Sequence, residues 1–392
     1  MEVTLGELER ELDQLRSLGL LRGVRLTATP PTPRFVIDGR DVVNLSSNNY
    51  LGLATHPELI KAAVEAVKIY GCSPTSSRLI SGTTDLHARL EERLSTFQGR
   101  EGALVFNSGY AANTGIISAL MGKEDLILSD SLNHASIIDG CRLSRAEVEV
   151  YPHGDLEALE GLLKSSYGKR RRLVITEGLF SMDGDIPNLC GLAELAEKYR
   201  AWLMVDEAHA FGIMGRGGRG LVNQLNLSDR VQILMGTFGK ALGSFGAFVT
   251  GERALIDYLI NRCRPFIFST ALPAHMCAIS LKALELLEEA DPMRERLEEN
   301  ARYFREELKS MGFDTMKSEA YIVPVLIGDP RLTKEMAELL FKEGVYAPAI
   351  RPPSVPPGSS RIRCGIMATH SLADLDMSLE AFRKAGRILG IA

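Results

Sequence analysis

The strongest constraint on the fold is an alternation of short apolar runs with longer helical patterns, from about residue 47 to residue 290. Several runs are apolar on both faces, as buried parallel strands are, and the stretches between them are long enough for crossover helices. The sequence therefore predicts a large α/β domain, residues 47–290, with a mostly parallel seven-stranded sheet. The expected strands are Ala103–Phe106, Leu126–Leu128, Val148–Tyr151, Leu173–Thr176, Trp202–Val205, Val231–Leu234 and Ala247–Thr250.

The segment before this domain, residues 1–46, is predicted to be an N-terminal arm. Its leucines recur at intervals of three and four residues, which indicates one stripe of an amphipathic helix (Leu5, Leu8, Leu12 and Leu15). We expect such a helix to pack on a partner subunit or on the body of its own chain. The proline-rich stretch Thr27–Pro33 then ends regular structure.

The segment after the large domain, residues 291–392, predicts a small α+β domain. A charged helix is expected over about Pro292–Met311, and the proline-rich turn Arg351–Gly358 cannot be a central strand, because proline has no N–H for a ladder. The expected strands are Tyr321–Ile327, Val345–Ala349 and Arg361–Ile366, and the expected helices lie near Thr333–Glu343 and Leu372–Ile388.

Composition excludes several classes of protein. The 392 residues carry 45 Lys+Arg against 50 Asp+Glu, and a net charge of −5 gives no electrostatic basis for binding nucleic acid. No run of about 18 apolar residues predicts a membrane span, and the acidic N-terminus has the features of neither a signal peptide nor a transit peptide. The six cysteines are scattered without a C-x-x-C pair, so we expect no metal site and a reducing, cytoplasmic environment.

Two short motifs are set aside because their structural context is missing. Gly215–Gly220 matches G-x-G-x-x-G, but no strand runs directly into it, so a mobile glycine loop is the better interpretation. Asp206–His209 spells D-E-A-H, yet the chain contains no G-x-x-x-x-G-K-[ST] phosphate loop. Neither motif therefore predicts a nucleotide site.

Chemically active side chains gather instead where the expected strands end. Asp206 ends one strand and His209 follows it, while Lys240 lies in a glycine-bounded turn after the next strand. A lysine in such an apolar, glycine-rich stretch is unusual, and desolvation lowers the pKa of an amine and makes it a nucleophile. Open α/β sheets bind ligands at this edge.

Two further strands end in the same way. Glu177 and Ser181 follow one of them, and Asn107–Tyr110 forms a turn that opens a helix, whose free N–H groups can bind phosphate. A phosphate cradle, a carboxylate, a histidine and a lysine on one sheet edge suit pyridoxal 5′-phosphate, which needs an amine, a carboxylate against its ring nitrogen and an anion site.

At this point the chain resembles a known group of proteins. Asp206, His209 and Lys240 in this order resemble the fold-type I pyridoxal-phosphate enzymes. Four longer motifs are similar to those of the α-oxoamine synthases within that group, and the resemblance runs from the N-terminal arm to the C-terminus. The motifs are Ser47–Leu53 (SNNYLGL), Asn133–Ser136 (NHAS), Glu177–Gly184 (EGLFSMDG) and Gly236–Lys240 (GTFGK).

The resemblance implies roles for the residues around the cofactor. Lys240 would hold pyridoxal phosphate and move the Cα proton of the substrate. Asp206 would pair with the ring nitrogen, His209 with the phenolic oxygen, and His134 would stack on the ring. Further contacts fall to Ser181, with Glu177 behind it, and the phosphate falls to Gly109, Tyr110 and Thr237.

The resemblance also implies a homodimer with shared active sites, because Ser269 and Thr270 would reach the neighbouring subunit's site. Arg363 would hold the substrate carboxylate in a bidentate pair, whereas Arg361 would be structural. Asn48 and His134 are assigned to the substrate site as well. The acyl substrate would meet three side chains, Arg22, Arg351 and Ser354, with the nearby Arg25 as the alternative to Arg22.

The family joins an amino acid to an acyl thioester with loss of CO₂. Phe268–Pro273, Gly243–Gly246 and Ala349–Pro356 are similar to those members that join L-alanine to a pimeloyl thioester, carried by coenzyme A or a carrier protein, in biotin biosynthesis. The alternative within the family is condensation of glycine with acetyl-CoA. Amino transfer or plain decarboxylation would instead proceed without a thioester, and a non-catalytic scaffold would lack the lysine that this chain has at position 240.

Overall fold

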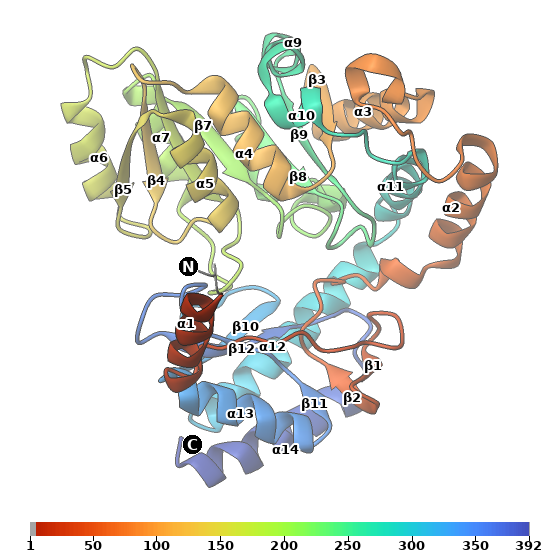
Figure 1. Cartoon of the computed structure of the whole chain (residues 1–392), viewed down its shortest axis with the longest axis vertical. Coiled ribbons are helices and arrows are strands. Elements are labelled where there is room, and N and C mark those ends of the chain that lie inside the picture. Colours follow the sequence, from red (N-terminus) through yellow and green to blue (C-terminus); the bar gives the residue numbers. More distant parts are fainter. Residues whose placement is uncertain (1–4, 392) are drawn as a thin grey trace. The chain divides into compact units, whose positions relative to one another are not determined.

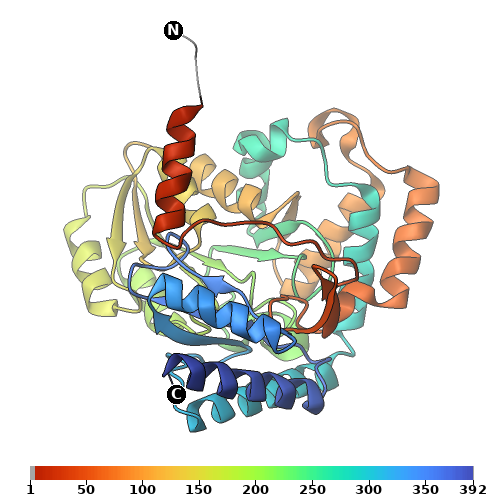
Figure 2. The same ribbon diagram turned by 60° about the horizontal axis from the view of Figure 1, so that its bottom comes forward.

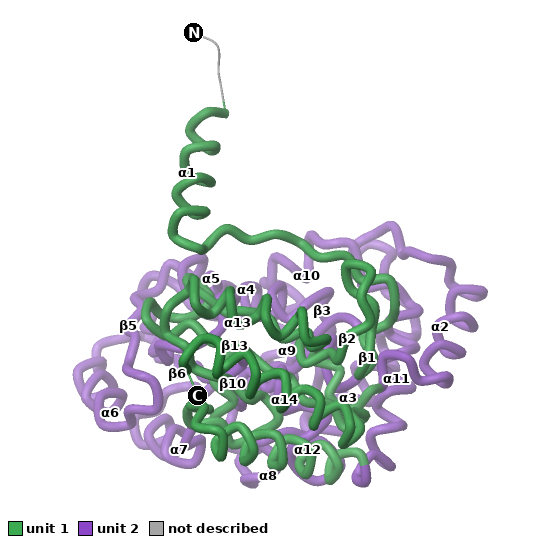
Figure 3. Tube along the Cα trace, turned by 90° about the horizontal axis from the view of Figure 1, so that it is seen from below, with its two compact units in different colours: residues 1–52, 182–185, 293–392 green, residues 53–181, 186–292 purple. Residues whose placement is uncertain are grey.

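The computed structural model describes residues 5–391, which form two compact units (Figure 3). Unit 2 comprises residues 53–181 and 186–292. Unit 1 comprises the residues up to 52, the short segment 182–185, and residues 293–392. The N-terminal segment thus belongs to the same unit as the C-terminal segment.

Unit 2 is built on a seven-stranded sheet with the order β3-β9-β8-β7-β6-β4-β5 (Figure 1). Only β9 runs antiparallel to its neighbours, and the remaining pairs are parallel. The predicted α/β fold with a mostly parallel sheet is therefore confirmed. The strands are β3 (Gly102–Phe106), β4 (Leu126–Asp130), β5 (Glu147–Tyr151), β6 (Arg172–Glu177), β7 (Trp202–Asp206), β8 (Ile233–Thr237) and β9 (Ala247–Gly251).

One predicted strand lies in a different place. We expected Val231–Leu234, but β8 begins at Ile233 and continues to Thr237. The N–H of Val231 is bonded to Leu227 O (3.1 Å), so this residue closes the turn before the strand. The apolar run therefore includes part of a turn, and the strand extends through Gly236, which the sequence pattern did not include.

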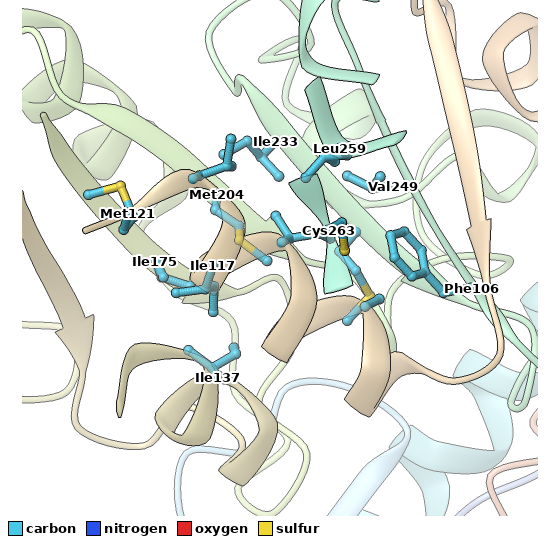
Figure 4. Packing of buried hydrophobic residues seen from close by; sticks show 14 of the residues in the cluster. Phe106, Ile117, Met121, Ile137, Ile175, Met204, Ile233, Val249, Leu259 and Cys263 are labelled. Carbon is cyan, nitrogen blue, oxygen red and sulfur yellow. The ribbon is translucent and has the colours of Figure 1, made fainter. Parts of the chain in front are cut away.

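Helices cover both faces of this sheet, which explains why its strands are apolar on both sides. On one face, a cluster joins Ile117 of α4 and Ile137 of α5 to Ile175, Met204 and Ile233 of the sheet (Figure 4). The opposite face packs on α6 and α7. The helices of unit 2 are α2 (Pro57–Tyr70), α3 (Asp85–Gln98), α4 (Gly109–Leu120), α5 (Ala135–Ser144), α6 (Leu156–Ser165), α7 (Leu189–Lys198), α8 (Leu221–Gln224), α9 (Arg253–Arg262), α10 (Arg264–Phe268) and α11 (Ala274–Leu287).

Unit 1 contains two small sheets with helices packed beside them. One has the order β1-β2-β11 and the other β10-β13-β12. In Figure 2, α14 (dark blue) runs beside α13 (lighter blue), and their residues are in contact. The elements are α1 (Gly6–Ser17), β1 (Arg34–Ile37), β2 (Arg40–Asn44), α12 (Asp291–Ser310), β10 (Ile322–Gly328), α13 (Pro330–Lys342), β11 (Val345–Tyr346), β12 (Ala349–Ile350), β13 (Ser360–Gly365) and α14 (Leu372–Leu389).

The strand predicted over Val345–Ala349 is two strands. β11 pairs with β2 of the arm, while β12 pairs with β13 in the other sheet. Pro348 lies between them and cannot donate to a ladder, so the chain leaves one sheet before it enters the other. The prediction of a single strand was wrong at this point.

The N-terminal helix α1 forms where the leucine stripe predicts it. None of its described residues is buried, and Leu5, Leu8, Leu12 and Leu15 are between 40% and 72% exposed. Figure 2 shows α1 (red) projecting from the other elements of unit 1. The stripe is therefore not packed on the body of its own chain, and packing on a partner subunit stays a prediction. Over residues 5–391 no helix has the length and apolar character needed to cross a bilayer.

Candidate active site

The carboxyl ends of the parallel strands in unit 2 surround a cavity of about 170 Å³. The structure brings together seven of the predicted cofactor residues here, together with Glu177. The complete lining is Gly109, Tyr110, Asn113, His134, Ser136, Glu177, Asp206, Ala208, His209, Met235, Thr237 and Lys240.

Helix α4 begins at this cavity. Ser108 caps it, because its Oγ accepts a hydrogen bond from Ala111 N (3.1 Å). Gly109 and Tyr110 form its first turn, where backbone N–H groups have no acceptor within the helix. Those groups and the positive end of the helix dipole favour an anion at this point.

Asp206 is the buried carboxylate of the site, with 5% of its surface exposed. It ends β7, and its Oδ1 accepts a hydrogen bond from Ala208 N (2.8 Å). Its Oδ2 accepts a second bond from Asn113 Nδ2 (2.8 Å). Both of these donors are neutral, so neither offsets the negative charge of the carboxylate.

His134 lies just before α5 and caps that helix. Its Nδ1 accepts a bond from Ser136 N (3.2 Å) and lies 2.8 Å from Ser136 Oγ. Although part of the residue is exposed, desolvation lowers the pKa of His134; the Asp206 carboxylate opposes this shift, and Lys240 adds to it. A helix N-terminus also disfavours the imidazolium, so His134 is a neutral ring.

Glu177 ends β6 and is 3% exposed. Its Oε1 accepts a hydrogen bond from the backbone N–H of His134 (2.7 Å). Burial raises the pKa of Glu177 well above its usual value, and the neighbouring Asp206 carboxylate raises it further. Both effects favour the neutral acid, and the bond from His134 N fixes the backbone of that histidine.

Lys240 follows β8 in a tight turn. Lys240 O accepts a bond from Gly243 N (3.0 Å), and Ser244 N donates to Phe238 O (3.0 Å). Gly243 has φ +61°, and a Cβ there would lie 2.4 Å from Ala54 N, so the turn requires glycine. Phe238 is fully buried against Phe248 and anchors the loop. Lys240 itself is only partly buried, less than its apolar surroundings in the sequence indicated.

A comparison with family models matches residues 40–382 of the chain to aminotransferase class I and II. The chain belongs to this family. As a member of it, the chain is similar to proteins named 8-amino-7-oxononanoate synthase. One from Geobacter sulfurreducens is 51% identical over 97% of this chain and 98% of the relative, and one from Thermoanaerobacter pseudethanolicus is 48% identical over 98% of both.

Similar solved structures agree with the fold. A serine palmitoyltransferase variant from S. paucimobilis with bound PLP and myriocin has a TM-score of 0.94 at 34% identity, with both chains fully covered. An 8-amino-7-oxononanoate synthase from Francisella tularensis has a TM-score of 0.78 at 29% identity and covers 88% of this chain and 98% of its own. The fold-type I architecture expected from the resemblance is therefore confirmed.

The residues around the cavity fit pyridoxal 5′-phosphate. The first turn of α4 offers N–H groups for a phosphate, and Lys240 offers an amine. The buried Asp206, which accepts hydrogen bonds from the neutral donors Asn113 Nδ2 and Ala208 N, fits a protonated ring nitrogen. In the described residues, no group of three or more His, Cys, Asp or Glu side chains could hold a metal ion.

Two predicted cofactor residues lie outside the lining of the cavity within the described chain. Ser181 is 8% exposed at the end of the turn that follows β6. Thr270 is held elsewhere in unit 2, where its carbonyl accepts a hydrogen bond from Asn107 Nδ2 (2.7 Å). Their roles in the site stay predictions.

Apart from His134, the predicted substrate residues belong to unit 1. Arg363 is 5% exposed and donates to Asn48 Oδ1 (3.1 Å) and to the hydroxyl of Tyr50 (3.4 Å). Arg361 differs: it is 2% exposed and forms an ion pair with Asp183 (2.6 Å). The two arginines of one strand thus have different partners, a neutral polar pair and a carboxylate.

The arginines expected to meet the acyl substrate form a cluster of their own. Arg22 NH2 donates to Pro352 O (3.2 Å) and to Ser354 Oγ (3.3 Å). Arg351 donates to Gly19 O, and its Nε is buried without a hydrogen-bond partner in the described residues. Burial lowers the pKa of Arg351, and the nearby Arg22 lowers it further. Arg25 pairs with Asp38 (3.1 Å).

Four lining residues were not predicted from the sequence: Asn113, Ser136, Ala208 and Met235. Asn113 had a usable signal, because it lies four residues after Gly109 and hence on the same helix face, within an otherwise small or apolar stretch. Ser136 is part of the NHAS motif but was given no role. Ala208 and Met235 carry no chemical signal of their own.

Proposed function

We propose that this chain catalyses the pyridoxal-phosphate-dependent condensation of L-alanine with a pimeloyl thioester, which gives 8-amino-7-oxononanoate, CO₂ and a free thiol. The observation that carries the proposal is the 46–51% identity, over nearly the whole chain, to proteins named for this activity. The reaction is an acyl transfer of biotin biosynthesis.

The chain's own residues divide the work around the cofactor. When bound, pyridoxal phosphate withdraws electrons from the Cα of the amino acid, so that a proton and later CO₂ can leave. Lys240 would hold the cofactor and move the Cα proton. Asp206 would maintain the charge of the ring nitrogen, and His209 would bind the phenolic oxygen. His134 would stack on the ring.

The remaining contacts position the phosphate and the substrates. The phosphate is held by the first turn of α4, at Gly109 and Tyr110, and by Thr237, and Ser181 also contacts the cofactor. Arg363 binds the carboxylate of the amino acid, and Asn48, already bonded to Arg363, orients that guanidinium. The acyl chain would meet the cluster of Arg22, Arg351 and Ser354, which we call the arm cluster because Arg22 of the N-terminal arm joins it.

We also propose a homodimer, with Thr270 reaching the neighbouring site. The exposed leucine stripe of α1 supports it, because four large apolar side chains in one row usually mark an interface. We place the protein in the cytoplasm, since all six cysteines are free thiols, as expected in a reducing compartment.

The deciding experiment is a comparison of substrate pairs with the purified holoenzyme. Thiol release is followed with L-alanine plus pimeloyl-CoA, with L-alanine plus the pimeloyl carrier protein, and with glycine plus acetyl-CoA. Mass spectrometry identifies the products, and the Lys240→Ala variant gives the background. We expect the alanine–pimeloyl pairs to turn over much faster; a preference for glycine plus acetyl-CoA would assign the alternative activity, and turnover of the amino acid without a thioester would contradict both.

A further inference from the structure

We propose that Asn113 and Ser136 are positioning residues that join Asp206 to His134 in one hydrogen-bonded chain and fix the orientation of both side chains. The effect of this hydrogen-bonded chain on the cofactor rests on the proposed function. The hydrogen bonds themselves can be tested in the protein without cofactor.

Asn113 is 1% exposed, and the nitrogen of its side-chain amide uses both of its hydrogens in hydrogen bonds. Nδ2 carries two hydrogens and donates one to Asp206 Oδ2 (2.8 Å) and the other to Ser136 Oγ (3.0 Å). The reverse orientation would place Oδ1 against the carboxylate, where two acceptors repel each other. Oδ1 instead points to a buried place without a hydrogen-bond partner among residues 5–391. The amide therefore has one favoured orientation.

Ser136 transmits this constraint to His134. Its Oγ accepts from Asn113, so its own hydrogen is available for His134 Nδ1 at 2.8 Å. Ser136 N also donates to the same Nδ1 (3.2 Å). With two donors aimed at it, Nδ1 is the acceptor, and the ring proton of His134 lies on Nε2. The hydrogen bonds thus have a defined direction at every step.

These hydrogen bonds also determine the charge of His134. Protonation of Nδ1 would set an N–H against the N–H of Ser136 and would force Ser136 Oγ to accept twice. The charged and titratable groups that share the cavity with the ring are Tyr110, Glu177, Asp206, His209 and Lys240, and Asp139 of α5 accepts a bond from Tyr110. A neutral ring is the form best suited to stack on an electron-poor pyridinium.

The experiment compares two variants of the protein with a matched control. Asn113→Leu removes both donors at nearly constant volume, and Ser136→Ala removes only the link to His134. The control is Thr114→Val, which lies beside Asn113 on α4, is 8% exposed, and loses a hydrogen bond to Tyr110 O (2.8 Å) that is unconnected with Asp206. If Asn113→Leu does not fold, Ser136→Ala still tests the chain.

The first measurement is the pKa of His134, by NMR of histidine-labelled full-length protein without cofactor. We expect it to rise in Ser136→Ala and in Asn113→Leu, and the double variant to show no greater rise than the larger single effect, because both act through one chain. The Thr114→Val variant should titrate like the wild type. An unchanged His134 pKa in Ser136→Ala, or strictly additive shifts, would overturn the proposal.

The second measurement is the dissociation constant of pyridoxal phosphate, together with the pH dependence of its visible absorbance. Loss of a hydrogen bond to a buried carboxylate should weaken binding about tenfold in Asn113→Leu. Equal affinity in Asn113→Leu and the wild type would contradict the effect on the cofactor. A wild-type protein that binds no cofactor would instead refute the proposed function. The histidine titration would still decide whether the hydrogen bonds link Asp206 to His134.

Discussion

Glu177 and Asp206 are paired residues at the ends of the neighbouring parallel strands β6 and β7. Two acidic side chains on paired residues do not both ionise readily, and differences between their environments separate their pKa values. Asp206 accepts two N–H donors, whereas burial and the Asp206 charge raise the pKa of Glu177 well above its usual value. The sheet register thus places side by side two acidic groups with different surroundings, and those of Glu177 favour its neutral form.

This difference predicts opposite outcomes for two amide substitutions. Glu177→Gln replaces a neutral acid by a neutral amide that can still accept the bond from His134 N, so most activity should remain. Asp206→Asn removes the charge that faces the ring nitrogen, and kcat should fall by roughly 10²-fold or more. Steady-state kinetics of the two variants side by side provide the test. Similar losses in both would show that the carboxyl groups are not distinguished in this way.

Lys240→Ala should abolish the covalent link to the cofactor. Borohydride reduction followed by peptide mass mapping should label Lys240 in the wild type and nothing in the variant. Because the amine also moves a proton, turnover should fall by at least about 10²–10⁴-fold. Label on another lysine of the wild type would contradict the assignment.

The two arginines of β13 should respond differently to leucine. Arg361 is buried in an ion pair with Asp183. Its removal leaves the Asp183 carboxylate without its cationic partner, so Arg361→Leu should reduce the free energy of unfolding by about 3–5 kcal/mol. Arg363→Leu should instead raise KM for the amino acid about tenfold or more and leave cofactor absorbance unchanged. Urea unfolding and KM measurements separate the two effects. An unchanged KM in Arg363→Leu would remove this residue from the substrate site.

Acid should destabilise unit 1 through His370. This ring is fully buried, accepts Met367 N and contacts Asn44 O, and burial lowers its pKa to about 4. The unfolded chain binds a proton near pH 6.5 and the folded one does not, so stability is lost as the pH falls from 6.5 toward 4, by up to about 1.4 kcal/mol per pH unit. His370→Asn should lower the urea midpoint at pH 7 yet reduce its dependence on pH. An equal pH dependence in the variant would contradict this account.

Glu207 should have the opposite pH dependence. It is 1% exposed beneath Gly220, and its Oε1 accepts Val222 N (2.7 Å). Burial raises the pKa of Glu207 to about 8, so the folded state retains a proton that the unfolded state loses near pH 4.5. Stability is therefore lost as the pH rises from 4.5 to 8. Glu207→Gln should be more stable relative to wild type at pH 8 than at pH 5, and thermal unfolding at both values measures the difference.

Much of the site was predictable because it depends on where strands end. Asp206, Glu177 and Thr237 are terminal strand residues, and parallel strands bring their carboxyl ends to one edge whatever their order. The arm cluster of Arg22, Arg351 and Ser354 forms as a contact between segments more than 300 residues apart, which no local pattern reveals. Its assignment came only from the resemblance.

The amino-acid sequence by itself determined the α/β class, the apolar strands and the residues at their ends, because these follow from local periodicity and from the chemistry of single side chains. Only the tertiary structure decided the strand order with its one antiparallel member, the division of residues 345–350 between two sheets, and the placement of Asn113 between Asp206 and Ser136. These features depend on packing and on hydrogen bonds between segments far apart in the chain, and such contacts leave no periodic trace in the sequence.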